Sequence, residues 1–135
     1  MSELSPEIIE KIRQWADYAD EDLRLAVHAL QIEDGCPCRL IAYHAQQCTE
    51  KYLKAFLVMC GVDFPYTHNI GRLLELLAEQ GGPAAEIESA DELTPYAITT
   101  RYPGEDEEVN KEEATNAVHI AERVRSAIRA ELPMP

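Results

Sequence analysis

The sequence predicts an all-α fold, an antiparallel up-and-down bundle of four to five helices that forms a single domain over residues 1–135. Three observations predict it. Apolar residues recur at steps of three and four along long segments, which is the period of an amphipathic helix. Short connections rich in proline and glycine separate these segments, and no segment alternates between apolar and polar residues as a strand does. Helices with short connections pack most simply as antiparallel neighbours.

The first predicted helix begins at Ser5-Pro6 and ends before Asp34-Gly35-Cys36-Pro37. A serine hydroxyl caps a helix well, and proline suits the first helical position. The apolar stripe of this helix comprises Ile8, Ile12, Trp15, Ala16, Ala19, Leu23, Ala26, Val27 and Leu30. Because Trp15 lies on this stripe, we expect it in the core.

The second predicted helix runs from about Cys38 to Cys60, and Gly61 is a common residue at a helix end. Its apolar face comprises Ile41, Ala45, Tyr52, Phe56 and Cys60, with Leu53 and Leu57 beside it. Another side is polar and comprises His44, Gln47, Lys51 and Lys54. Residues three and four apart share one face of a helix, so we expect these polar side chains to gather.

The third predicted helix is shorter, and Thr67 is expected to cap its start. Its apolar residues are Ile70, Leu73, Leu74, Leu76 and Leu77, and the sequence Gly81-Gly82-Pro83 ends it. The stretch 84–100 is ambiguous, since residues 84–93 fit a short helix and Pro95 fits the start of another turn.

The last predicted helix begins at Asn110, which forms a sequence typical of a capping box with Glu113. Its buried stripe comprises Ala114, Ala117, Val118, Ala121, Val124 and Ile128. The loop before it contains Tyr102-Pro103-Gly104, because proline and glycine disfavour regular structure.

The composition predicts a cytoplasmic domain that does not enter a membrane. The first ten residues lack the order of a signal peptide, and no apolar run approaches the roughly 20 residues that cross a bilayer. The net charge of −13 argues against binding of nucleic acid through phosphates alone. The charge is uneven, however: residues 86–113 contain ten carboxylates, whereas residues 39–72 contain four cations and two carboxylates. We expect the acidic run to be a solvated surface.

Four cysteines are expected to be free thiols in a reducing compartment. Cys36, Cys38, His44 and Cys48 lie close in sequence, but they lack the paired Cys-x-x-Cys of zinc sites. We therefore predict no metal and no other cofactor.

Three blocks in order carry a resemblance to a known family. The first is Ala42-Tyr43-His44-Ala45-Gln46-Gln47-Cys48-Thr49-Glu50-Lys51-Tyr52-Leu53-Lys54-Ala55-Phe56-Leu57. The second and third are Pro65-Tyr66-Thr67-His68-Asn69-Ile70 and Arg101-Tyr102-Pro103. Over roughly residues 10 to 130, the chain resembles the HEPN domain family (higher eukaryote and prokaryote nucleotide-binding), whose members show a similar His-x-x-Gln-x-x-Glu-Lys-x-x-Lys-Ala helix.

The resemblance implies an all-α bundle of four or five helices, commonly dimeric. Many family members pair with a minimal nucleotidyltransferase, often as a toxin and antitoxin, and others resemble the helical domain of aminoglycoside nucleotidyltransferases. A large subset are metal-independent ribonucleases with a late Arg-x(4–6)-His motif. This chain departs from that motif, since His119 is too far from Arg101, while Arg39 and His44 have the spacing but lie at the start of the second helix.

Three sets of residues are candidates for binding a phosphate. His44, Gln47, Lys51 and Lys54 supply positive charge and hydrogen-bond donors, although Glu50–Lys54 also fits an ordinary surface pair. Arg101 offers two-pronged phosphate recognition and Tyr102 a ring for stacking, although a salt bridge in a structural loop is the alternative.

His68, the third candidate, follows the predicted cap and fits either a phosphate contact at a helix N-terminus or local capping chemistry, of which we favour capping. His28 and His119 have no visible partner and are expected to be surface or structural residues.

Three functions remain open on the sequence. One is a module that binds a nucleotide or another phosphate-bearing ligand and works with a partner nucleotidyltransferase. The second is a ribonuclease toxin acting on RNA through Arg39 and His44, with histidine as acid or base. The third is a ligand-free dimeric scaffold. We expect a homodimer or a partner subunit, because a bundle with this many apolar positions leaves an exposed apolar patch.

Overall fold

The computed structural model of the chain describes residues 4–97 and 108–134, and these residues form helices and no strands. The elements in chain order are α1 (Pro6–Ala29), α2 (Cys38–Met59), α3 (Ile70–Glu79), the 3-10 helix η1 (Ala85–Ala97) and α4 (Lys111–Arg129). The predicted all-α fold is therefore confirmed. None of the described helices is long and apolar enough to cross a lipid bilayer.

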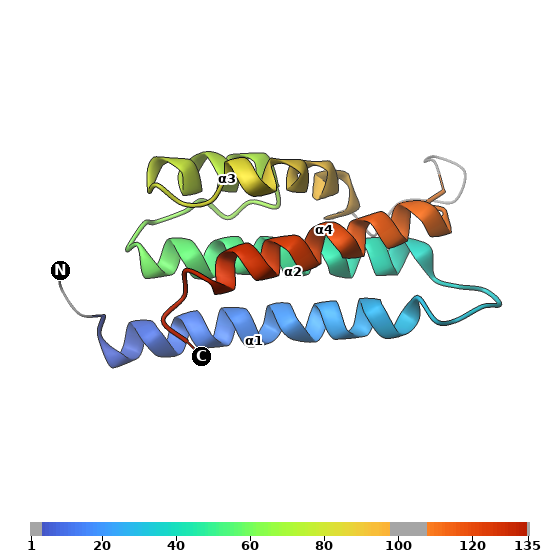
Figure 1. The fold of residues 1–135 in the computed structure, drawn as a ribbon, viewed down its shortest axis with the longest axis horizontal. Coiled ribbons are helices and arrows are strands. Elements are labelled where there is room, and N and C mark those ends of the chain that lie inside the picture. The colour runs from blue at the N-terminus through green and yellow to red at the C-terminus, as the bar shows by residue number, and fades with distance from the viewer. Residues whose placement is uncertain (1–3, 98–107, 135) are drawn as a thin grey trace.

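α1 and α2 run in opposite directions, and α2 lies at the centre of the bundle (Figure 1). α2 contacts every other helix, and α1 is its principal partner. α3 and η1 together form one long side of the bundle, and α4 returns along α2 beside α1 (Figure 1). Side chains of α2 therefore meet residues from the rest of the domain, which makes α2 the element that positions the site.

The predicted helix starts at Ser5 and Asn110 are confirmed. The Ser5 hydroxyl accepts a hydrogen bond of 3.2 Å from the amide of Ile8, and Pro6 occupies the first helical position. The Asn110 side chain accepts a 2.7 Å bond from the amide of Glu113, whose carboxylate accepts one from the amide of Asn110. Each bond satisfies an amide that the first turn of a helix leaves unpaired.

The expected cap of α3 is wrong by two residues. Asn69, not Thr67, is the N-cap, and its side-chain oxygen accepts a 3.1 Å bond from the amide of Arg72. The Thr67 hydroxyl instead accepts a bond of 3.0 Å from the amide of Asn69, one step earlier in the turn. Two residues of the same capping chemistry lie within one turn, and the sequence alone did not decide between them.

Within the ambiguous stretch, Ala85–Ala97 form η1, which is interrupted at Ile87, where φ is −126° and ψ is 22°. Pro95 lies inside it. At the end of α2, Gly61 adopts the left-handed backbone (φ +70°), as its place after the helix predicts. Trp15 differs from expectation: it is only half-buried, and its ring meets that of Phe64 edge-on with 6.4 Å between centroids.

Candidate functional site

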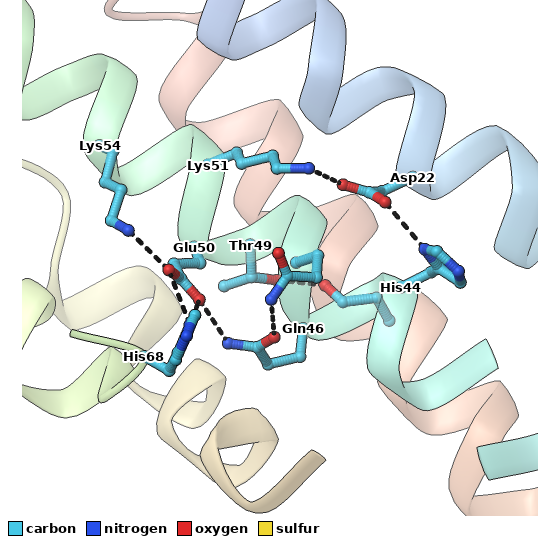
Figure 2. Close-up of polar contacts among 10 residues, drawn as sticks. Asp22, His44, Gln46, Thr49, Glu50, Lys51, Lys54 and His68 are labelled. Carbon is cyan, nitrogen blue, oxygen red and sulfur yellow. Dashed lines mark hydrogen bonds and ion pairs between the residues drawn. The ribbon is translucent and has the colours of Figure 1, made fainter. Parts of the chain in front are cut away.

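The most unusual part of the core is a group of buried polar residues on α2, which comprises Gln46, Thr49, Glu50 and Lys54. Glu50 is the centre of the group. One of its oxygens accepts a 2.7 Å hydrogen bond from Gln46, and the other accepts a 2.6 Å bond from Lys54. His68, just before α3, brings its Nδ1 atom within 3.0 Å of the same carboxylate (Figure 2). We call Gln46, Glu50, Lys54 and His68 the Glu50 network.

The partners of Glu50 determine its charge. Burial raises the pKa of this carboxyl, but hydrogen bonds from Lys54, His68 and Gln46 outweigh it and hold the pKa below its usual range. Glu50 is therefore ionised at neutral pH although it is buried. Lys54 balances this charge, and its ammonium also lies 5.6 Å from the ring centre of Trp15, which favours a cation.

A second polar group links α2 to α1. Asp22 of α1 accepts a 2.5 Å bond from the ammonium of Lys51 and lies 2.8 Å from Nδ1 of His44 (Figure 2). About a quarter of each of the His44 and Lys51 side chains is exposed, so this group reaches the surface. We call Asp22, His44 and Lys51 the Asp22 triad.

The structure divides the predicted polar face of α2 between these two groups. His44 and Lys51 turn toward α1, whereas Lys54 turns toward Glu50 and the start of α3 (Figure 2). The side chain of Gln47 donates a 2.8 Å bond to Gln46 and so joins the Glu50 network. Glu50 and Lys54 do form the ion pair that their spacing predicts, but the pair is buried and not on a solvated surface.

The His68 side chain does not cap the start of α3, contrary to the expectation from the sequence. Its Nδ1 atom contacts Glu50, eighteen residues away, while half of its side chain stays exposed. The ring also lies edge-on to Tyr66, with 5.9 Å between centroids. The reason is that Asn69 and Thr67 provide the bonds at the start of α3, which leaves the His68 side chain for the tertiary contact.

The remaining predicted site residues are Arg39, Arg101 and Tyr102. Arg101 and Tyr102 are outside the described residues. Arg39 is exposed in the first turn of α2, five positions before His44. Positions five apart on a helix differ by about 140°, so Arg39 and His44 project from different sides of α2 within one chain.

The cysteines do not converge on one point. Cys48 is fully buried, whereas Cys36 and Cys38 are half-buried near the start of α2. The Cys36 thiol donates to the carbonyl of Ala29 at 3.6 Å. In the part of the chain that the structure describes, no three His, Cys, Asp or Glu side chains are arranged to hold a metal ion.

A polar cluster around Asp20 of α1 was not predicted from the sequence. The buried Tyr52 of α2 donates its hydroxyl to Asp20, which also accepts bonds from Arg125 at 2.8 Å and Arg129 at 3.4 Å on α4. Burial raises the pKa of Asp20, but the bonds from Arg125 and Tyr52 bring it below the usual value. A signal was present, because Asp20 follows Ala16 by one turn and so borders the apolar stripe of α1.

The comparisons with known proteins agree with this fold. The HEPN domain model matches residues 12–131, so the chain belongs to the HEPN domain family. The crystal structure of TT1696 from Thermus thermophilus is similar with a TM-score of 0.75 and 28% identity, over 90% of this chain and 98% of that one. ST0689, an archaeal HEPN homologue, shares the fold with a TM-score of 0.71 and 24% identity, over 90% and 97% of the two chains. No curated protein matches the chain.

Proposed function

We propose that this HEPN domain binds a nucleotide or another phosphate-bearing ligand and works with a partner nucleotidyltransferase. The observation that carries the proposal is the Glu50 network beside the Asp22 triad. Burying charged groups costs several kcal/mol per ion before pairing, and apolar residues of similar size often stabilise a core as well or better. A small domain that keeps such charged groups in its core therefore favours a function for them beyond folding.

The proposed binding residues are those of the polar side of α2 and its surroundings. Lys51 uses one ammonium proton in its observed ion pair and is about a quarter exposed, which leaves donors for a phosphate. Lys54 is almost completely buried and supports the site by holding Glu50. Gln47, His44 and the exposed part of His68 add polar groups around them. Arg101 and Tyr102 belong to the proposal on the sequence alone, as a second phosphate contact and a ring for stacking.

The proposal also includes the setting of the module. We infer a cytoplasmic homodimer or partner subunit, since several large apolar side chains are exposed on the described surface, namely Tyr18, Leu25, Ile32, Leu40 and Tyr66. Light scattering tests the dimer, and co-purification with a co-expressed nucleotidyltransferase tests the partner. A monomer that captures no such enzyme contradicts this part of the proposal.

Replacing Lys51 with alanine tests the ligand site. We expect the affinity for ATP or GTP, measured by titration calorimetry, to fall about tenfold or more, as for a lost charge-assisted hydrogen bond. Arg72→Ala is the control, because Arg72 makes a one-to-one surface pair with Glu75 on α3. Wild-type protein that binds neither nucleotide rejects the proposed function. An unchanged affinity in Lys51→Ala rejects the site.

A second function, a ribonuclease, is favoured by one observation. His44 is held by Asp22 through Nδ1, which leaves Nε2 for a substrate, and Lys51 provides a cation on the same carboxylate. A carboxylate that orients a histidine is a common arrangement for a general acid or base. Arg39 would have to come from a second copy, because it projects from another side of α2.

The ribonuclease proposal predicts cleavage of RNA that depends on His44. We expect His44→Ala to lower the rate by a factor of about 100 or more, which is the usual contribution of a positioned acid or base. Arg39→Ala is expected to lower it as well, and chelator is expected to leave it unchanged. Cleavage that persists in His44→Ala, or that wild-type protein does not show, rejects this function.

A further inference from the structure

The Asp20 cluster forms the wall of a groove between α1 and α4. The groove has a volume of about 240 Å³ and is lined by Asp20, Leu23, Arg24, Val27, His28 and Arg125. We propose that this groove is an anion site that takes the phosphate or diphosphate group of a small ligand. The proposal does not depend on the polar residues of α2 and goes beyond the function proposed above.

The first argument is the local charge. Arg24, Arg125 and Arg129 stand at or beside the groove, and Asp20 is the only carboxylate among its described lining residues. The pair of Arg72 with Glu75, by contrast, joins one cation to one carboxylate on the surface. A chain of net charge −13 repels anions at long range, so an anion binds only where a local excess of cations outweighs this repulsion. Charges further than roughly 8 Å away are largely screened at physiological ionic strength.

The second argument is that one donor group is already oriented. Arg125 is bonded to Asp20 through its Nε atom, at 2.8 Å, and 40% of its side chain is exposed. The guanidinium carries five N–H donors in a rigid plane, so terminal donors remain for a ligand. Tyr52 and Arg129 hold Asp20 in turn, and the carboxylate therefore has little freedom to move away from Arg125. A fixed guanidinium loses less entropy when it binds a phosphate than a free one does.

The third argument is that two donors on the rim have no task in the described part of the fold. Arg24 and His28 lie four residues apart on α1, so they share one face of the helix. Within the described residues, neither side chain has a hydrogen bond or an ion pair. Together with Arg125 and the apolar side chains of Leu23 and Val27 they line the groove. An apolar lining lowers the local dielectric constant and strengthens the attraction between arginine and an anion.

The size of the groove indicates the class of ligand. Pockets for whole drug-sized ligands usually have volumes of about 300–1,000 Å³, and this groove is smaller. Its size therefore suits a phosphate or diphosphate group better than a complete nucleotide. Arginine recognises such groups through two parallel hydrogen bonds, which a lysine site does not provide. We infer that the rest of a larger ligand would extend out of the groove.

Titration of wild-type protein with inorganic diphosphate tests the site. At physiological salt we expect binding, a loss of about tenfold in affinity in Arg24→Ala, and a smaller loss in His28→Ala. Neither side chain bonds to another described residue, so both variants should melt at the temperature of the wild type. Arg13→Ala is the matched control, since Arg13 lies on the same helix and pairs with Glu10 outside the groove. It should bind diphosphate as the wild type does.

Each result decides the proposal. Wild-type protein that does not bind diphosphate, or an Arg24→Ala variant that binds it as tightly as the wild type, overturns the anion site. The function proposed above survives either result if ATP binding still depends on Lys51. ATP and a short RNA are further probes that distinguish the source of the phosphate. The probe that resembles the natural ligand should bind more tightly than diphosphate, and its affinity should also fall in Arg24→Ala.

Discussion

Glu50→Ala is expected to lower the free energy of unfolding by about 3–5 kcal/mol, the cost of leaving one partner of a buried ion pair alone. The variant removes the acceptor of Lys54, whose side chain is almost completely buried, and of the buried amide of Gln46. Among the described residues, Lys54 would then retain only its contacts with the rings of Trp15, Phe64 and Tyr66. Chemical denaturation followed by circular dichroism measures the change.

Two further variants show whether the buried charge is the cause. Glu75→Ala removes a carboxylate from an exposed pair with Arg72 and should change stability by less than about 1 kcal/mol. Lys54→Met in the Glu50→Ala background removes the stranded ammonium and should restore part of the lost stability. A double variant that is no more stable than Glu50→Ala would show that packing, not charge, causes the loss.

The fold could be predicted because its signals are local. A helix start depends on residues within four positions, as at Ser5 and Asn110, and an apolar stripe depends on a fixed period. The cap of α3 was misplaced because Thr67 and Asn69 have equivalent chemistry. Trp15 lies on the apolar stripe, yet no described helix covers it completely, so periodicity overestimated its burial.

The candidate site could be predicted only in part, because its geometry depends on contacts between helices. Lys51 and Lys54 are three residues apart, and the sequence placed them on one face. Their side chains diverge because Asp22 of α1 lies on one side and Glu50 on the other (Figure 2). The period of α2 describes α2 alone and does not identify which carboxylate of a neighbouring helix faces each lysine.

Asp20 and Asp22, two carboxylates of α1, contribute in different ways. Asp22 contacts α2 through His44 and Lys51, near the surface. Asp20, two residues earlier, points toward another side of the same helix and joins α1 to both α2 and α4. A change at Asp22 should therefore affect the proposed ligand site of α2, whereas a change at Asp20 should affect the packing of three helices and the α1–α4 groove.

Asp20→Ala is accordingly expected to destabilise the domain by about 2–3 kcal/mol, since it leaves the hydroxyl of the buried Tyr52 without its acceptor. The bonds to Arg125 and Arg129 add less, because these side chains are partly exposed. For a domain of this size the melting temperature should fall by roughly 10 °C, which differential scanning calorimetry measures.

Asp17→Ala, which removes an exposed carboxylate on the same helix, is the control and should stay within about 0.5 kcal/mol of the wild type. Tyr52→Phe should cost only about 1 kcal/mol, because it removes the donor and leaves Asp20 with its two arginines. If Asp20→Ala melts with the wild type, the cluster does not hold the three helices together, and Asp20 serves only to orient Arg125.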